Sequence, residues 1–419
     1  MTLLKKVSPA DVRERRAHPV DEGTLAEARE IVEAVRTGGV DAVRACAERF
    51  GELKPGESLV LGPDTMRSAL DGLDGSTRGA LERAASRIDA FARAQRDAVR
   101  EMKIAIPGGE AGHSVLPVTD AGCYAPGGRY PLPSSVLMTA ITARAAGCGR
   151  VVVASPGAHP VMLASASIAG ADEFLRVGGA HAIASLAYGF EGLRACDVIA
   201  GPGNKWVTAA KQFVHGVVGI DMLAGPSELV VLADEHADPA TVAADLLAQA
   251  EHDTDASAML VTTHAGLVDA VERELAAQLA TLETREVARV ALGNGFACVC
   301  AGMDEAMGVV ERIAPEHLEL SCAEAEAVRA RVRHAGMVFV GDATPEVAGD
   351  YGAGPNHTLP TGGTARYSAG LSVLDFLRVR SWLRIDDPAG ASGVLHDTAA
   401  LARVEGLAAH ERSACRRLR

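Results

Sequence analysis

The 419-residue sequence is poor in aromatic residues, has no CxxC pair and has no long apolar run. Aromatic residues make up 4% of the chain and hydrophobic residues 48%, which is typical of helices on a Val-rich sheet rather than of an aromatic-rich β-sandwich. A run of about 18 uncharged apolar residues and a signal-peptide core are both missing, so the sequence predicts a cytoplasmic protein without membrane spans. The eight cysteines form no disulfide framework, which favours reduced thiols with structural roles.

Positive charge is also scarce, since the formal net charge is -13 at pH 7. Nucleic-acid binding needs a concentrated basic surface, so we expect no nucleic-acid partner. A small-molecule substrate fits this composition better.

The dinucleotide fingerprint GxGxxG is missing as well, so a standard Rossmann nucleotide site is not indicated. Three other glycine turns each follow an expected strand and open an expected helix: PGGRYPLP at 126–133, VGGAHA at 177–182 and GPGNKW at 201–206. A tight turn explains each one alone. Because parallel strands end at one common edge, the three together predict a nucleotide site there.

Strand-like and helix-like runs alternate in two series after Gly122, which predicts βαβ units and parallel sheets. We expect an α/β fold with two Rossmann-like domains, an incomplete dinucleotide fingerprint, and small N-terminal and C-terminal helical segments. The expected division is an N-terminal segment 1–21, a first domain of 22–122 together with 227–370, an inserted nucleotide-side domain 123–226, and a C-terminal segment 371–419 that is helical after Asp397.

Gln249 and His252 are the first candidate metal ligands. Asp238 is an expected N-cap and Pro239 the first helical residue, and this register places Gln249 and His252 three residues apart on one helix face. A lone His at a helix end is more often a cap or a core residue, and an amide oxygen is an unusual zinc ligand. Spacing alone therefore does not identify a metal site.

Glu316 and His317 form an adjacent acid-base candidate in APEHLEL. They precede an expected strand, at a junction that we expect to expose both side chains, and such a pair suits general acid-base chemistry. A solvated turn is the alternative. Asp350 and His357 lie on a glycine-rich loop, GDYGAGPNH, where a loop carboxylate can be a ligand or simply solvated.

Glu405 and His410 are the last candidates, in RVEGLAAHER. Five residues on an ideal helix correspond to about 140° of rotation, so one straight helix does not present both side chains on one face.

Taken together, these segments resemble the histidinol dehydrogenase family from about residue 22 to the C-terminus. The motifs that carry the resemblance are PGGRYPLPSSVLM at 126, VGGAHAIASLAYG at 177, GPGN at 201, IDMLAGPSE at 220, DLLAQAEHD at 245, PEHLEL at 315, GDYGAGPNHTLPT at 349 and EGLAAHERS at 405.

The resemblance implies one Zn²⁺ per subunit and a catalytic pair. The implied zinc ligands are Gln249, His252, Asp350 and His410. Glu316 and His317 inherit the catalytic roles, His317 as the base for the alcohol proton and Glu316 as the base that activates water.

The resemblance also implies positions that bind substrate and NAD. The implied substrate-binding residues are Ser227, Gln249, His252, His317, Asp350, His357, Glu405 and His410, and the implied NAD-binding residues are Tyr124, His181 and Asn204. His181 departs from the family pattern, which has Gln in VGGAQA. An imidazole offers fewer hydrogen bonds than an amide, so this substitution bears on cofactor affinity.

The implied reaction is the NAD-dependent four-electron oxidation of L-histidinol to L-histidine through L-histidinaldehyde. The family is a homodimer whose C-terminal segment reaches the partner's site, which frees Glu405 and His410 from the geometry of one subunit. A paralogue that oxidises another amino alcohol or a sulfonated diol is the alternative, and a catalytically silent NAD-binding or zinc-binding regulator is a second one. Retention of His357 and Glu405 disfavours the paralogue.

Overall fold

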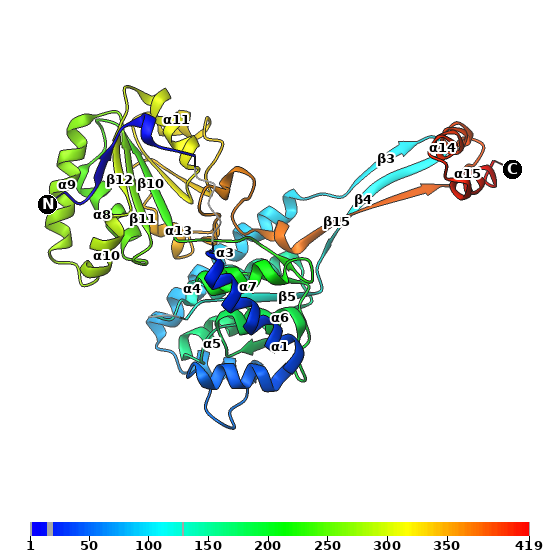
Figure 1. Ribbon diagram of the computed structural model, residues 1–419, viewed down its shortest axis with the longest axis horizontal. Helices are drawn as coiled ribbons and strands as arrows, with labels where there is room; N and C mark the ends of the chain where they lie inside the picture. The colour runs from blue at the N-terminus through cyan, green and yellow to red at the C-terminus, as the bar shows by residue number, and fades with distance from the viewer. Residues whose placement is uncertain (1, 15–19, 128–129, 419) are drawn as a thin grey trace.

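Two α/β bodies and a thin projecting arm make up the molecule (Figure 1). The computed structural model describes residues 2–14, 20–127 and 130–418. Each body is built on a six-stranded sheet, and the arm contains a three-stranded sheet. The α/β class with parallel sheets is therefore confirmed.

Sheet 1 forms the first body and is parallel, in the order β1-β12-β11-β10-β13-β14. Its strands are β1 (Lys5–Val7), β10 (Glu228–Ala233), β11 (Ser257–Thr262), β12 (Phe296–Val299), β13 (His317–Ser321) and β14 (Met337–Val340). Alternate residues of β10 point to opposite faces, Leu229 and Val231 into one core and Val230 and Leu232 into the other. This double burial explains the continuous apolar run of the strand.

Helices cover both faces of sheet 1. One face packs against α8 (Pro239–Ala250), α9 (Ala265–Leu279) and α10 (Arg285–Leu292), and the other against α11 (Met303–Ile313) and α12 (Ala325–Arg329). The Asp238 side chain caps α8 by accepting a hydrogen bond from the Thr241 N–H, with Pro239 in the first turn, which confirms the predicted start of this helix.

Sheet 2 forms the second body, in the order β2-β7-β6-β5-β8-β9, and apart from β2 its paired strands are parallel. Its strands are β2 (Val60–Leu61), β5 (Asp120–Tyr124), β6 (Arg150–Ala154), β7 (Glu173–Leu175), β8 (Val198–Ala200) and β9 (Gly219–Ile220). One face packs against α4 (Pro133–Ala146) and α5 (Pro160–Ile168), the other against α6 (Gly179–Tyr188) and α7 (Lys205–Val214).

The N-terminal helices belong with sheet 2, so the expected grouping of 22–122 with 227–370 is corrected. Helix α1 (Glu22–Arg49) packs against α6 and α7, while α2 (Pro63–Asp71) and α3 (Gly75–Ala98) pack against α5 and α4. An amphipathic helix can bury its apolar face against either body, and the spacing of its apolar residues does not specify which body it packs against. The expected separate N-terminal segment instead supplies β1 to sheet 1.

The arm combines residues 102–117 with the C-terminal segment of the chain (Figure 1). Its antiparallel sheet has the order β15-β4-β3, and α14 and α15 pack against each other at its far end. The bounds are β3 (Met102–Ile106), β4 (Gly109–Pro117), β15 (Leu377–Ile385), α14 (Ser392–Val404) and α15 (Ala408–Cys415). The C-terminal segment is thus helical after Asp397 as expected, but it begins with a long strand that its charged residues concealed.

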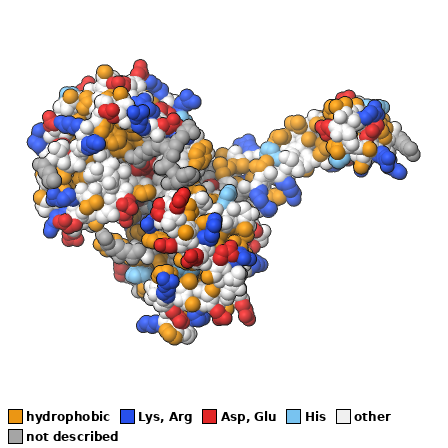
Figure 2. All heavy atoms as spheres, in the orientation of Figure 1, with side chains coloured by type: hydrophobic (Ala, Val, Ile, Leu, Met, Phe, Trp, Pro, Cys, Tyr) orange, Lys and Arg blue, Asp and Glu red, His pale blue; other side chains and the backbone are white. Residues whose placement is uncertain are grey.

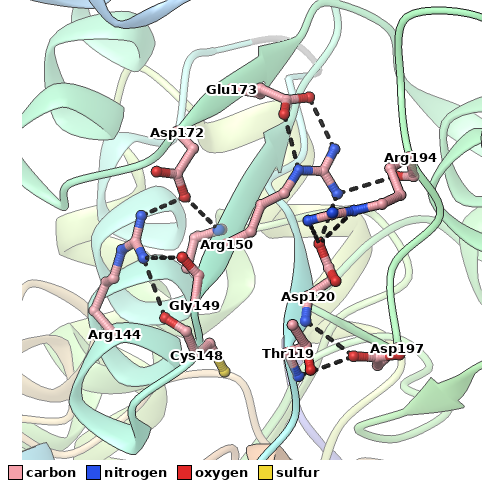
Figure 3. A network of polar contacts seen from close by, with 11 residues as sticks. Thr119, Asp120, Arg144, Cys148, Gly149, Arg150, Asp172, Glu173, Arg194 and Asp197 are labelled. Atoms are coloured by element: carbon pink, nitrogen blue, oxygen red, sulfur yellow. Dashed lines mark hydrogen bonds and ion pairs between the residues drawn. The ribbon is translucent and has the colours of Figure 1, made fainter.

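A charged network joins the amino ends of the sheet 2 strands (Figure 3). Arg150 contacts Asp120 at 3.1 Å and Glu173 at 2.8 Å, with 10% of its side chain exposed. Arg194 adds a second contact to Asp120, and Asp197 accepts hydrogen bonds from the N–H groups of residues 119 and 120. Because it lies at the amino edge, this network supports the sheet and leaves the opposite edge open to ligands.

The remaining short elements are α13 (Val347–Asp350), η1 (Pro9–Asp11), η2 (Thr364–Arg366) and η3 (Val373–Phe376). Among the described residues, none of the helices combines the length and the apolar character that crossing a bilayer requires.

Candidate active site between the two bodies

Several of the predicted site residues, among them His317 and His357, meet where the amino edge of sheet 1 faces the carboxyl edge of sheet 2. His317 is the first residue of β13. From the other body, Ser135 in the first turn of α4 lies with its Oγ 3.2 Å from His357 Nε2. The site is therefore shared between two bodies whose strands are far apart in sequence.

Glu316 and His317 are both buried, at 5% and 3% exposed, so the expected exposed junction was wrong. Strand β13 is an interior strand between β10 and β14, and Glu346 lies with its Oε1 3.4 Å from His317 Nε2. The solvated-turn alternative is excluded for the same reason.

Strand β10 fixes the two side chains. His317 Nδ1 lies 3.3 Å from the carbonyl oxygen of Glu228, and Glu316 Oε2 accepts a hydrogen bond of 2.9 Å from the Glu228 N–H. A carbonyl only accepts, so Nδ1 carries the proton in this contact and Nε2 presents its lone pair. The Nε2 atom is therefore available as a base.

Burial sets the protonation of this pair. Burial, partly offset by the nearby Asp350 carboxylate, lowers the pKa of His317 to about 4. Burial raises the pKa of the Glu316 carboxyl well above its usual range. Burial thus favours the neutral form of both groups, an imidazole that can accept a proton and a carboxyl group that holds its proton more tightly than in water.

Two of the predicted metal ligands, His252 and Asp350, lie close to His317. His252 Nε2 is 3.4 Å from Asp350 Oδ2, about the separation of two donors that each lie roughly 2.1 Å from one tetrahedral zinc ion. The Gln249 side chain is 0% exposed, and neither of its amide atoms has a hydrogen-bond partner among the described residues. An unpaired buried amide is costly unless it serves a ligand, so this donor set fits a metal.

The helix containing Gln249 is shorter than predicted. Helix α8 ends at Ala250 with Glu251 as its C-cap, so His252 lies beyond the helix and does not share a helical face with Gln249. His252 contacts Asp350 from the segment that follows the helix.

Asp350 and His357 come together through the backbone. His357 Nδ1 lies 2.9 Å from the Asp350 carbonyl oxygen, and Asp350 is the last residue of α13 rather than part of an open loop. Ser227 lies just before β10, at the same edge of sheet 1, and its carbonyl accepts a hydrogen bond from the Ser257 N–H.

Sequence reasoning missed Glu346. Its donor atom lies within 4.8 Å of those of His317 and Asp350, and together the three could hold a metal ion. Burial, followed by repulsion from Asp350, raises the pKa of Glu346 to about 8. The available signal was its position four residues before Asp350, one helical turn away.

Glu405 and His410 are not brought to this site in their own subunit. Both are exposed, and they lie in the α14–α15 pair at the far end of the arm (Figure 1). Helix α14 ends at Val404 and α15 starts at Ala408, with a turn at Gly406 whose φ is 73°. The two side chains therefore do not share one helix, and the rotation calculated for a single ideal helix does not apply to them.

The three glycine turns do lie at one edge of sheet 2. They follow β5, β7 and β8, which run parallel. Gly128 and Arg129 of the first turn lie outside the described residues. Asn204 caps α7 by accepting hydrogen bonds from two backbone N–H groups, and it is exposed at this edge.

The VGGAHA turn is already occupied by protein groups. The Glu52 carboxylate accepts a 3.1 Å hydrogen bond from Gly178 N–H, and Tyr124 Oη accepts one of 3.1 Å from Gly179 N–H. His181 is 2% exposed, pairs with Glu52 at 2.8 Å and stacks on Phe50. The expected open anion site at this turn is therefore filled in this conformation, whereas the start of α7 is exposed.

Comparisons with known proteins cover almost the whole chain. The family model for histidinol dehydrogenase matches residues 14–418. A histidinol dehydrogenase from Thermobifida fusca (strain YX) is 44% identical over 415 residues, covering 96% of this chain and 94% of that protein. One from Cereibacter sphaeroides is 46% identical over 396 residues, covering 93% and 90%.

A solved structure agrees with these relatives. The crystal structure of histidinol dehydrogenase from Elizabethkingia anophelis matches with a TM-score of 0.93 at 29% identity, covering 100% of this chain and 98% of that one. The similarity therefore includes both bodies and the arm.

Proposed function

The chain belongs to the histidinol dehydrogenase family, and from this premise we propose that it oxidises L-histidinol to L-histidine through L-histidinaldehyde, with two NAD molecules used in turn. It is an oxidoreductase of histidine biosynthesis. The observation that carries the proposal is the buried His317, whose Nε2 lone pair faces the cluster that contains Asp350. The paralogue alternative is not favoured, because the matched relatives share one activity.

Zinc is the proposed metal, one per subunit. Gln249, His252 and Asp350 would hold it from within the subunit, and the unpaired Gln249 amide supports this assignment. Bound zinc would anchor the substrate imidazole and amine and so place the reacting carbon, which is a positioning contribution.

NAD is the proposed hydride acceptor, bound along the carboxyl edge of sheet 2. The exposed start of α7 at Asn204 supports this location, because helix N-termini favour phosphate and amide groups. At the VGGAHA turn the cofactor would contact Tyr124 and His181 only around or in place of Glu52.

The protein groups carry the proton transfers. His317 Nε2 takes the alcohol proton as the first hydride leaves, while Nδ1–H donates to Glu228. The Glu316 carboxylate takes a proton from the water that adds to the aldehyde, and the resulting diol yields the second hydride to the second NAD. Ser227 and His357 lie where they could bind the substrate.

We further propose a homodimer in which Glu405 and His410 enter the partner's site, and a cytoplasmic location. Several apolar side chains of the arm are exposed, as Figure 2 shows, and this supports coverage by a second copy. Those exposed by 55% or more are Ile104, Val379, Leu383, Leu401 and Val404. Eight cysteines without a disulfide framework support a reducing compartment.

The test is the ratio of NADH formed to histidinol consumed by the zinc-loaded enzyme. We expect two NADH per histidinol, with histidine as the product. A ratio of one with accumulation of an aldehyde, or turnover of another alcohol that is far faster than that of histidinol, would contradict the proposal.

A further inference from the structure

Glu346 is the most deeply buried acid beside the proposed base, and neither the proposed zinc site nor the proposed proton transfers use it. Its side chain is 0% exposed, and neither carboxyl oxygen forms a hydrogen bond within the described chain. Its Oε1 lies 3.4 Å from His317 Nε2. A buried carboxyl group without a partner destabilises the fold, so its presence calls for a functional reason.

Among the described titratable groups near Glu346, the imidazoles of His317 and His252 can gain positive charge, whereas the neighbouring carboxyl groups cannot. Asp245 and Glu319 lie nearby and hydrogen-bond to each other, so they offer Glu346 no opposite charge. On its other side lie His317 and Asp350, whose donor atoms are within 4.8 Å. The carboxyl group of Glu346 therefore faces the reaction site.

The ring of His317 has a polar group near each nitrogen. The Glu228 carbonyl accepts from Nδ1, and Glu346 Oε1 lies 3.4 Å from Nε2 without a hydrogen bond, while Phe339 contacts the ring with its centroid 5.9 Å away. The Glu228 contact alone fixes one nitrogen, so a second contact at Nε2 would define the direction of the ring.

We propose that Glu346 is a positioning residue for His317: it fixes Nε2 toward the reacting alcohol and accepts the Nε2–H hydrogen bond once the imidazole has taken the alcohol's proton. This role rests on the proposed function. In the step concerned, the hydride leaves the substrate carbon for NAD, the hydroxyl proton moves to Nε2, and the carbonyl of the aldehyde forms.

A functional role and a structural role predict opposite changes in stability. Replacing an unpaired buried acid with a neutral group of similar size removes a desolvation cost, so thermal stability should rise or stay level. The same replacement should lower kcat, because the His317 ring loses the group that positions it. A residue that only supports the fold would lower stability and activity together.

The experiment compares Glu346→Gln and Glu346→Leu with the matched control Glu319→Gln in the zinc-loaded enzyme. Glu319 is a matched control because it is also a buried acid and lies on the same strand as His317. It differs from Glu346 in that its carboxyl group hydrogen-bonds to Asp245. We measure kcat, KM for histidinol, bound zinc and Tm.

We expect kcat to fall about 10-fold in Glu346→Gln, which keeps an accepting oxygen, and about 100-fold in Glu346→Leu. The KM for histidinol and the bound zinc should stay near wild-type values, Tm should not fall, and Glu319→Gln should keep its kcat.

Three results would overturn the proposal: an unchanged kcat in Glu346→Leu, a loss of zinc that makes Glu346 a metal ligand, or a fall in Tm that parallels the fall in kcat. A wild-type enzyme that binds zinc but forms no NADH from histidinol would instead refute the proposed function.

Discussion

His317 shows how burial prepares a single residue for chemistry. An imidazole in water is largely neutral at pH 7 and can face in any direction. Here the pKa is lowered to about 4 and the Glu228 carbonyl selects the tautomer, so the lone pair at Nε2 is always available near neutrality.

Replacing His317 by Asn should therefore lower kcat by about 100-fold or more, because the base is lost while the zinc ligands stay. Kinetics together with metal analysis checks this. A loss of bound zinc equal to the loss of activity would show that His317 is a ligand instead.

His181 is the residue at which this chain departs from its family pattern, and it has a partner. Glu52 joins the imidazole to the Gly178 N–H, so the substitution is embedded in a local hydrogen-bond pair.

His181→Gln should change the KM for NAD more than the KM for histidinol, because an amide can still donate to Glu52 and also offers an acceptor. Steady-state kinetics with each substrate varied in turn measures this. A larger effect on histidinol would refute the cofactor role of this position.

At the scale of elements, sheet 2 is held at its amino edge by charge and left open at its carboxyl edge. The Arg150 guanidinium joins β5 and β7 through Asp120 and Glu173, across the start of its own strand β6 (Figure 3). The charged network around Arg150 therefore lies at the edge of sheet 2 opposite to the three glycine turns.

Arg150→Met should lower the free energy of unfolding by about 3 kcal/mol, because Glu173 and Asp120 lose a mostly buried partner. Arg194→Met, at a guanidinium that is 67% exposed, should cost less than about 1 kcal/mol. Urea unfolding followed by circular dichroism compares the two. Equal losses would mean that burial of Arg150 contributes nothing.

At the scale of the molecule, the arm places two residues proposed to bind zinc or substrate, Glu405 and His410, far from the other residues of the proposed active site. His410 lies on the arm and His317 in the body, so each proposed site would combine one subunit's body with the other's arm.

Mixed dimers test this arrangement. His317→Asn and His410→Asn dimers should each be inactive, and random exchange of subunits should restore about a quarter of wild-type activity, since half the dimers are mixed and each holds one intact site. Chains that use their own His410 would give no recovery on mixing.

Much of the fold followed from local patterns. The alternation of buried strands and helices predicted the parallel sheets, the Asp238–Pro239 start of α8 was placed correctly, and the three glycine turns fell at one edge. Each of these depends on a few consecutive residues.

Other features depend on which surfaces meet. Helix α1 was assigned to the wrong body, Glu316 and His317 were expected in solvent, and strand β15 was hidden by alternate charges. In each case the local pattern allows several partners, and packing between distant segments selects one.

The sequence by itself determined the α/β class, the family, and the residues proposed for metal, substrate and cofactor, because these are written in short contiguous motifs. Only the tertiary structure decided that Glu346 faces His317, that Glu52 fills the VGGAHA turn and that His410 lies far from its own subunit's site. The physical reason is that burial and electrostatic environment arise from contacts between segments far apart in the chain, and no local spacing records those contacts.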